Sequence, residues 1–248
     1  MPATPEVPTL LNLLNDNDPT VRLEKITNDI SETCARARTL LGLITTQSLS
    51  SSTIVDMIQE LHSLDQVAVT WRQTPEWSFT NFEISERPDL EPAARGITTT
   101  VQIHPDIWMA YEWNYHRTAR LLFLTQLLKC SLAALSTPDL AVAEETALID
   151  TSVNCTATII WLADQILATV PQIFGDVNYM GQLHDVDAMG GPPRCRAIGG
   201  YLLLWPIRTI KGAEFATSGE QKERAWGVFE RLREYTGMKA VLGDESII

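Results

Sequence analysis

The chain has 248 residues, of which 45% are hydrophobic and 20% are charged, a composition typical of a folded globular protein. Its 31 Asp and Glu residues outnumber its 19 Lys and Arg residues, which gives a formal net charge of −12. Because proteins that bind nucleic acids or anionic membranes usually present basic surfaces, this balance argues against both functions for the chain alone.

Targeting and membrane-spanning signals are not found in the sequence. The first residues lack the basic and apolar regions of a signal peptide, and apolar runs such as residues 201–207 are too short to cross a bilayer. The 4 cysteines are widely spaced and form no CxxC pair, which is typical of free thiols in a reducing compartment. We therefore expect a cytoplasmic or nuclear protein without a membrane partner.

Two amphipathic helices are predicted at the start of the chain. Asp18 and Pro19 are typical helix-start residues, and apolar residues then recur at intervals of three and four as far as Ile44. After the polar stretch QSLSSS, a second helix is predicted from about Thr53 to Arg72. The short link between the two predicts an antiparallel helical hairpin.

Residues 73–103 are predicted to form a long ordered loop. They contain prolines, a glycine and scattered charges, and the interleaved aromatic residues would attach the loop to the helices. Residues 98–103 are the candidate for a short extended piece. Loops of this length within a compact domain are often lids or binding loops.

Two long helices are predicted to follow the loop. The first runs from Pro105 to about Leu135, and its second half is apolar on nearly all sides, which is typical of a central buried helix. The second starts near Pro138 and is predicted to end at Pro171.

The last part of the chain begins with a glycine-rich, irregular stretch over residues 175–194. A buried helix is predicted for residues 195–213, interrupted by a kink at Pro206. A capping box formed by Ser218 and Gln221 predicts the start of the final helix, which closes near Gly237.

These patterns predict an all-α fold, a single-domain bundle of about six to eight helices with long ordered loops. Internal repeats, charge blocks and composition shifts that would mark a domain boundary are not found in the sequence. We therefore expect one domain over residues 1–248, in which residues 1–17 are the candidate for a flexible segment.

Several sequence segments, in this order, resemble the C-terminal regulatory region of fungal zinc-cluster transcription factors. The segments are MIQELHSLDQVAVTW, MAYEWNYHRTARLLFLTQLLKC, ILATVPQIFGDV, GGYLLLWPIRTI and EQKERAWGVFERLREYTGMKAVLG. They carry the Leu-Asp and Trp, the WN..R..R helix, the Val-Pro turn, the Gly-Gly and Trp-Pro helix and the terminal turn of that family. The resemblance covers roughly residues 20–243 and implies a helical effector region linked to secondary metabolism.

The chain departs from this family in one respect. The resembled regulators begin with a six-cysteine zinc cluster that presents a helix to DNA, and this sequence has no such cluster. We therefore expect that the chain does not bind DNA itself, either as a truncated regulator or as a stand-alone relative.

The polar residues of the helix that starts at Pro105 are the richest candidates for chemistry. Glu112 and His116 lie one turn apart, so the carboxylate could tune the imidazole for acid–base work. Trp113, Arg117 and Arg120 share one flank, where two arginines beside an aromatic ring could bind a carboxylate or an enolate-like oxygen. The catalytic candidates are His116, Glu112 and Arg117, and the ligand-binding candidates on this helix are Trp113, Asn114 and Arg120.

A structural role competes with the functional one for these residues. Buried polar groups must be hydrogen-bonded, and Asn114, Arg117 and Arg120 would serve to tie the central helix to neighbouring loops. We favour this structural interpretation for these three residues and leave His116 open.

Further ligand-binding candidates are Asp164, His184 and Arg208. Asp164 interrupts an apolar run and is expected to bond to a neighbouring helix or to have a raised pKa in a cavity, with Arg208 as its suggested partner. His184 lies in the glycine-rich stretch, which we interpret as a loop hinged at glycines over a pocket. Histidine spacing typical of a metal site is not found, so no metal is expected.

Nucleotide-binding and hydrolase motifs such as GxxxxGK[ST], GxGxxG and GxSxG are not found in the sequence, and no cofactor is expected. Two hypotheses remain. The first is a regulatory module that binds a hydrophobic small molecule and contacts a partner regulator or a second copy of itself. The second is a cofactor-free isomerase or cyclase, including a pericyclic one, that acts on a natural-product intermediate in an apolar pocket.

Overall fold

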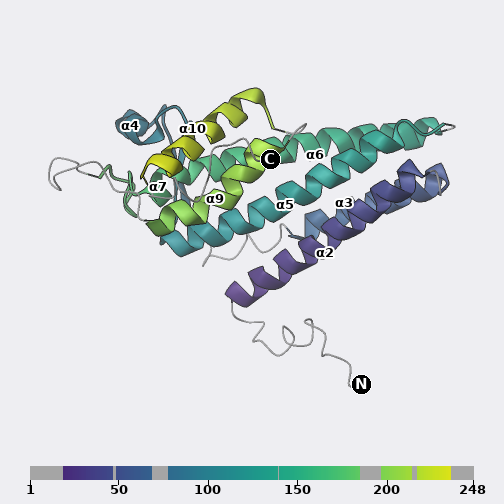
Figure 1. Cartoon of the computed structure of the whole chain (residues 1–248), viewed down its shortest axis with the longest axis horizontal. Helices are drawn as coiled ribbons and strands as arrows, with labels where there is room; N and C mark the ends of the chain where they lie inside the picture. Colours follow the sequence, from purple (N-terminus) through teal and green to yellow (C-terminus); the bar gives the residue numbers. More distant parts are fainter. Residues whose placement is uncertain are drawn as a thin grey trace, which may run out of the picture. The chain divides into compact units, whose positions relative to one another are not determined.

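The structure, a computed structural model, describes residues 19–46, 49–68, 78–138, 140–184, 197–213 and 217–235. The predicted all-α class is confirmed, since helices make up most of the described residues and their strands form one small antiparallel pair (Figure 1). The elements in chain order are α2 (Pro19–Thr45), α3 (Ser51–Ala68), β1 (Thr80–Glu83), the 3-10 turn η3 (Pro88–Leu90), α4 (Glu91–Ala94), β2 (Thr100–Ile103), α5 (Ile107–Ala134), α6 (Val142–Ala168), α7 (Val170–Phe174), α9 (Ala197–Gly212) and α10 (Gly219–Tyr235).

The contacts within the chain divide it into two compact units. The first comprises residues 1–77 and 126–151, and the second comprises residues 78–125 and 152–248. Helices α5 and α6 each have one part in either unit. The expectation of a single domain over residues 1–248 stays a prediction.

The first unit is built on α2 and α3, which pack against each other as the predicted helical hairpin requires. Helix α2 begins at Pro19, as predicted, and α3 begins at Ser51 and is followed down to Ala68. The end predicted near Arg72 lies outside the described residues. A buried thiol joins the hairpin to α5, because Cys130 Sγ donates a hydrogen bond to the Ala37 carbonyl oxygen at 3.2 Å.

The prediction of a loop over residues 73–103 was incomplete. The extended piece expected at residues 98–103 is found as β2, but it pairs with β1, which the sequence did not reveal. Four polar and aromatic residues, TNFE, are too short a pattern for period-two alternation to be recognised. Behind the pair lies a small apolar core that includes Leu90, Val101 and Val177, and the partly buried Phe82 packs against it.

Side chains bond to the backbone at both ends of the edge of β2 that faces away from β1. Thr98 Oγ1 donates to the Thr100 carbonyl oxygen at 2.7 Å and accepts the Thr100 N–H at 3.2 Å. At the other end, Gln172 Oε1 accepts the His104 N–H at 2.9 Å, and Gln172 Nε2 donates to the His104 carbonyl at 2.7 Å. The two Gln172 bonds anchor the end of β2 to the short helix α7 (Val170–Phe174).

Pro171 does not end the long helix, as the sequence predicted, but belongs to a short helix that follows it. Helix α6 ends at Ala168, but the chain turns at Thr169 and begins α7, with Pro171 in its first turn. A proline is tolerated there because its missing N–H would have no partner within the helix. Gly175, with φ of +79°, ends α7 in the left-handed conformation that glycine adopts easily.

The closing helices α9 and α10 pack against each other, and α9 also packs on α7. Helix α9 is continuous through Pro206, so the predicted interruption at this residue is wrong, while the expected kink stays a prediction. At Gly199 the helices approach closely, since a Cβ atom there would lie 2.4 Å from the Ile173 carbonyl oxygen. The predicted capping box is confirmed, with Ser218 N–H to Gln221 Oε1 and Gln221 N–H to Ser218 Oγ both at 3.1 Å.

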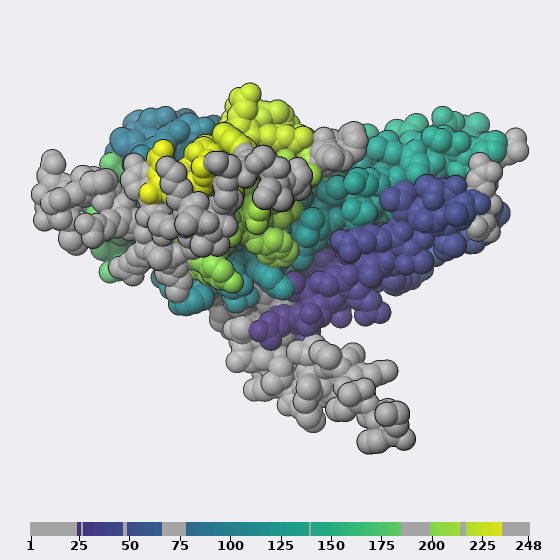
Figure 2. All heavy atoms as spheres, viewed as in Figure 1, coloured from purple at the N-terminus to yellow at the C-terminus, as the bar shows by residue number. Residues whose placement is uncertain are grey.

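Within the second unit, the buried carboxylate of Asp176 connects α10 to the segment that follows α7. Asp176, which follows α7, accepts hydrogen bonds from both terminal nitrogens of Arg231 at 2.6 Å, and Arg95 lies 3.9 Å from it. In the space-filling view α10, in yellow, accordingly lies beside the blue surface of the segment that contains α4 (Figure 2).

One helical stretch in the described part of the chain, Val142–Phe174, meets the length and composition of a membrane-spanning helix, contrary to the sequence expectation. Many of its apolar side chains are fully buried in the molecule, among them Leu148, Ile159 and Leu162. Burial of this kind is typical of the core helix of a globular protein.

Candidate functional site

The centre of the second unit holds a buried arginine, Arg117 of α5, which is 0% exposed. A buried charge is costly unless it is hydrogen-bonded, and Arg117 meets this need through neutral oxygens. Its Nη2 donates to Gln102 Oε1 at 2.6 Å, and its Nη1 donates to Asn114 Oδ1 at 3.2 Å and to the Gln165 carbonyl at 3.1 Å. Side-chain amides from β2 and α5 and a backbone carbonyl of α6 thus converge on one guanidinium group.

Aromatic rings also contact this guanidinium group. Arg117 Cζ lies 4.8 Å from the centroid of the Trp113 ring and 5.5 Å from that of Phe79, so both rings contribute cation–π attraction. The two rings meet edge to face, with their centroids 5.1 Å apart. Trp113, predicted as a ligand-binding residue, therefore contacts Arg117 inside the molecule.

His104 joins the same cluster from the end of β2. Its Nε2 lies 3.0 Å from Gln102 Oε1, and because an amide oxygen can only accept, the Nε2–H donates. Burial and then the nearby charge of Arg117 lower the pKa of His104 from 6.5 to about 3. The imidazole is therefore neutral at physiological pH. Within the described part of the chain its Nδ1 has no hydrogen-bond partner.

Asn114 connects this cluster to the break between α6 and α7. Its Nδ2 donates to Thr169 Oγ1 at 2.7 Å, and Thr169 Oγ1 in turn donates to the Ile166 carbonyl at 2.8 Å. The hydroxyl at the break therefore has both a donor and an acceptor. Asn114 and Arg117 tie α5 to β2 and to the α6–α7 junction, as the structural interpretation predicted.

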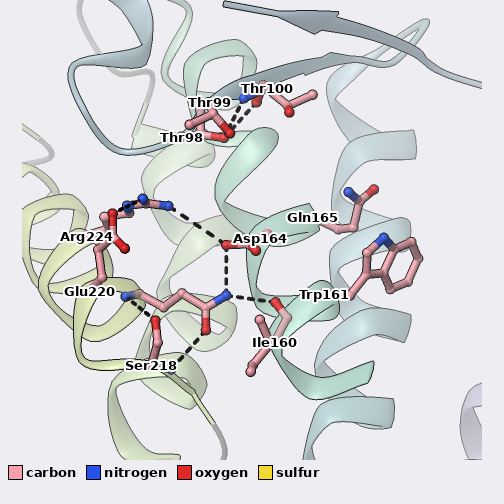
Figure 3. Close-up of a pocket in the computed structure, with 11 residues that line it drawn as sticks. Thr98, Thr99, Thr100, Ile160, Trp161, Asp164, Gln165, Ser218, Glu220 and Arg224 are labelled. Carbon is pink, nitrogen blue, oxygen red and sulfur yellow. Dashed lines mark hydrogen bonds and ion pairs between the residues drawn. The ribbon is translucent and has the colours of Figure 1, made fainter. Parts of the chain in front are cut away.

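A pocket of about 480 Å³ lies beside this cluster in the second unit (Figure 3). Three segments far apart in the sequence form it: the threonines that lead into β2, the second half of α6, and the start of α10. The lining residues are Thr98, Thr99, Thr100, Ile160, Trp161, Asp164, Gln165, Ser218, Glu220, Gln221 and Arg224.

The α10 side of the pocket is held by a chain of polar contacts around Asp164. Gln221 Nε2 donates to Asp164 Oδ1 and to the Ile160 carbonyl, both at 2.8 Å. Arg224 Nη1 lies 3.9 Å from Asp164 Oδ1, and the same guanidinium group binds Glu220. Figure 3 shows Asp164 directed toward Arg224. This wall of the pocket is therefore organised before any ligand enters.

Gln165 is the residue that the pocket and the buried cluster share. Its side chain lines the pocket, while its Oε1 accepts a hydrogen bond from Gln102 Nε2 at 3.1 Å. Its carbonyl oxygen accepts from Arg117. Gln165 thus connects the pocket wall to the arginine, directly through its carbonyl and indirectly through the Gln102 side chain.

The structure brings together only part of the predicted site. Trp113, Asn114 and Arg117 meet in the buried cluster, and Asp164 lines the pocket. His116 and Arg120 are buried on α5, and Glu112 is half-buried; like Arg117, none of these residues lines the pocket.

Asp164, His184 and Arg208 are not brought together. Asp164 bonds to a neighbouring helix, as expected, but the suggested pairing with Arg208 was wrong: Arg224 is the cation beside Asp164, and Arg208 is exposed on α9. His184 is half-buried after α7, where its N–H donates to the Asp176 carbonyl at 2.9 Å. The predicted hinge glycines were 181, 190 and 191. Gly181 is described and has a φ of +72°, whereas positions 190 and 191 lie outside the described residues.

The sequence analysis missed the glutamines that organise the buried cluster and the pocket. Gln102, Gln165 and Gln172 were not predicted, and Gln221 was predicted only as part of the capping box. A polar residue within the extended apolar stretch TVQIH is the one signal that could have suggested Gln102. In the part of the chain that the structure describes, no group of three or more His, Cys, Asp or Glu side chains is arranged to hold a metal ion.

Comparisons with known proteins gave no match, whether against protein-family models, curated proteins or solved structures.

Proposed function

We propose that the chain is an effector module that binds a small molecule and does not itself bind DNA. The observation that carries this proposal is the pocket of about 480 Å³, which lies within the range of about 300–1,000 Å³ typical of small-molecule sites. Its walls come from segments that a ligand could hold together, namely the approach to β2, α6 and α10.

Descent from the regulatory region of fungal zinc-cluster transcription factors is part of the proposal. This descent rests on the five sequence segments that occur in the order found in that family. The proposed link to secondary metabolism rests on the same resemblance, and the proposed location is the cytoplasm or nucleus. Pairing with a second copy or a partner regulator rests on the same resemblance. The net charge of −12 supports a module that leaves contact with DNA to another protein or domain.

The pocket modifies one part of the expectation, the hydrophobic character of the ligand. Asp164, Gln165 and Arg224 line it together with Ile160 and Trp161. A ligand that matches this lining carries hydrogen-bonding groups as well as an apolar face, because buried polar groups need partners.

The cofactor-free enzyme receives less support from the geometry. Its expected catalytic residues, His116, Glu112 and Arg117, do not line the pocket, and Arg117 is engaged by the amides of the buried cluster. A general acid or base must lie within hydrogen-bond reach of the reacting atoms.

The test is a thermal-shift screen of a diverse small-molecule library against the wild type and two variants. Thr99→Phe fills the pocket from an exposed position of its lining, and Thr146→Phe adds the same ring on an exposed position of α6 outside it. Compounds that raise the melting temperature of the wild type and of Thr146→Phe, but not of Thr99→Phe, are expected. A library without any such compound would contradict the proposed function.

A further inference from the structure

We propose that the ligand of this pocket is a neutral ring that carries hydroxyl groups. This inference rests on the proposed function and specifies the chemical class that the pocket takes. The pocket's charges, its remaining hydrogen-bonding capacity and its exposed indole ring each restrict that class.

The charges in the lining disfavour an acidic ligand. Asp164 and Glu220 carry two negative charges and Arg224 carries one positive charge, which leaves the lining at −1. The Arg224 guanidinium group already contacts Glu220 and lies 3.9 Å from Asp164. A ligand carboxylate would have to compete for that guanidinium and approach two carboxylates of like charge.

The start of α10 is also disfavoured as an anion site. Ser218 Oγ accepts the Gln221 N–H in the capping box, so this backbone donor of the first turn is already in use. Glu220 lies in the same first turn and adds negative charge to it. A neutral ligand therefore fits this end of the pocket.

The groups that remain for a ligand are both donors and acceptors. Gln165 uses its Oε1 for Gln102, so its Nε2 is the donor that it offers to the pocket. Asp164 uses its Oδ1 for Gln221, so its Oδ2 is the acceptor that it offers. The exposed Thr99 hydroxyl can both donate and accept. Hydroxyl groups match this set, because one hydroxyl can donate to Asp164 and another can accept from Gln165.

The indole of Trp161 supplies the apolar face for a ring. It lines the pocket and is 41% exposed, so part of the indole surface borders the pocket. Trp161 and Gln165 lie one helical turn apart on the same flank of α6 (Figure 3). A ring stacked on Trp161 would thus place a hydroxyl substituent near Gln165.

Two sources share this chemistry, a sugar and a phenol, and calorimetric titration with methyl glucoside and with resorcinol separates them. Saturable binding of one of the two is expected, and the one that binds identifies the source. Resorcinol dimethyl ether, which lacks hydroxyl donors, and dihydroxybenzoate, which adds a carboxylate, are expected to bind at least about tenfold more weakly than resorcinol if the phenol is the source. If the sugar is the source, glucuronate is the charged control, and it is expected to bind at least about tenfold more weakly than methyl glucoside.

The protein controls use two tryptophans of nearly equal exposure. Trp161→Ala is expected to weaken binding of the probe about tenfold, whereas Trp226→Ala, at a position 42% exposed on α10 outside the pocket lining, leaves it unchanged. Thermal melts of both variants serve as the control that each of them still folds.

Three results would overturn the assignment: no saturable binding of either hydroxylated probe, equal or tighter binding of the matched ether or acid, or unchanged affinity in Trp161→Ala. Each of these leaves the proposed function standing if the library screen finds other compounds that Thr99→Phe excludes. If that screen is empty as well, both proposals fail.

Discussion

Arg117 holds its charge inside the molecule by spreading its hydrogen bonds over a side-chain amide from β2, an amide on its own helix and a backbone carbonyl of α6. A lysine keeps the charge but lacks the planar fork that reaches these oxygens together. Arg117→Lys is therefore expected to lower the free energy of unfolding by about 2–3 kcal/mol.

Urea denaturation followed by circular dichroism measures this loss. Arg208→Lys is the matched control, because Arg208 is exposed and the same change should cost less than about 0.5 kcal/mol. If the two variants were equally stable, the guanidinium group would not act as a structural tie, and a functional role for Arg117 would gain support.

His104 makes the stability of the protein depend on pH. Its pKa is lowered to about 3 in the folded protein, by burial and then by Arg117, while an unfolded histidine titrates near 6.5. Between these values the unfolded chain binds the proton and the folded protein does not, so acid favours unfolding. The stability contributed by the neutral His104 is complete above about pH 6.5 and is lost as the pH falls toward 3.

The expected contribution is a loss of about 1.4 kcal/mol per pH unit in the free energy of unfolding between about pH 6 and pH 4. Other groups titrate in this window, so the comparison is with His104→Gln, whose amide can still donate to Gln102 and does not titrate. The wild-type slope minus the variant slope isolates His104. Parallel stability curves for the two proteins would rule out the depressed pKa.

At the level of elements, the contact between α7 and α9 depends on a missing side chain. A Cβ atom on Gly199 would lie 2.4 Å from the Ile173 carbonyl oxygen, which is backbone and cannot rotate away. Gly199→Ala is therefore expected to push the two helices apart and to lower the melting temperature, at a cost of about 1–3 kcal/mol.

Gly227 of α10 is the control for this substitution. A Cβ atom there would meet nothing within 4 Å, so Gly227→Ala should be neutral or should stabilise the helix by up to about 1 kcal/mol. Differential scanning calorimetry of both variants compares them directly. A Gly199→Ala protein as stable as Gly227→Ala would mean that the α7–α9 contact is not close-packed.

The helices were predictable because their signals are local. Pro19 and the capping box of Ser218 and Gln221 marked true helix starts, and the apolar second half of α5 is buried. Pro171 was predicted to end a helix, but it lies in the first turn of α7. A proline is common both after the end of one helix and in the first turn of the next, so the sequence alone does not distinguish the two.

The candidate site was less predictable because it depends on contacts between distant segments. Arg117 and Asn114 stood out as polar residues on a buried helix, but their partner Gln102 comes from a short strand without a recognisable pattern. The pocket needs the approach to β2, α6 and α10 at once, and no spacing within one segment encodes that meeting. Arg208 was suggested as the partner of Asp164, and Arg224 was missed, for the same reason.

For the molecule as a whole, the net charge of −12 predicts that the chain alone does not bind duplex DNA. Like charges repel, and the repulsion is strongest at low ionic strength, where screening is weakest. Gel-shift titrations at low salt are therefore expected to leave the DNA unshifted. A retarded band that weakens steeply as salt is added would contradict this expectation, since it would reveal phosphate contacts by a basic patch.

The side chains that cover β2 also bear on how the molecule meets its neighbours. In an antiparallel pair, alternate residues of a strand direct their backbone groups away from the partner, and an uncovered row of such groups recruits strands from other chains. Here the Thr98 hydroxyl and the Gln172 amide occupy these groups at Thr100 and His104. A second copy therefore cannot extend the sheet at this edge by β-augmentation without first breaking bonds that the monomer already makes.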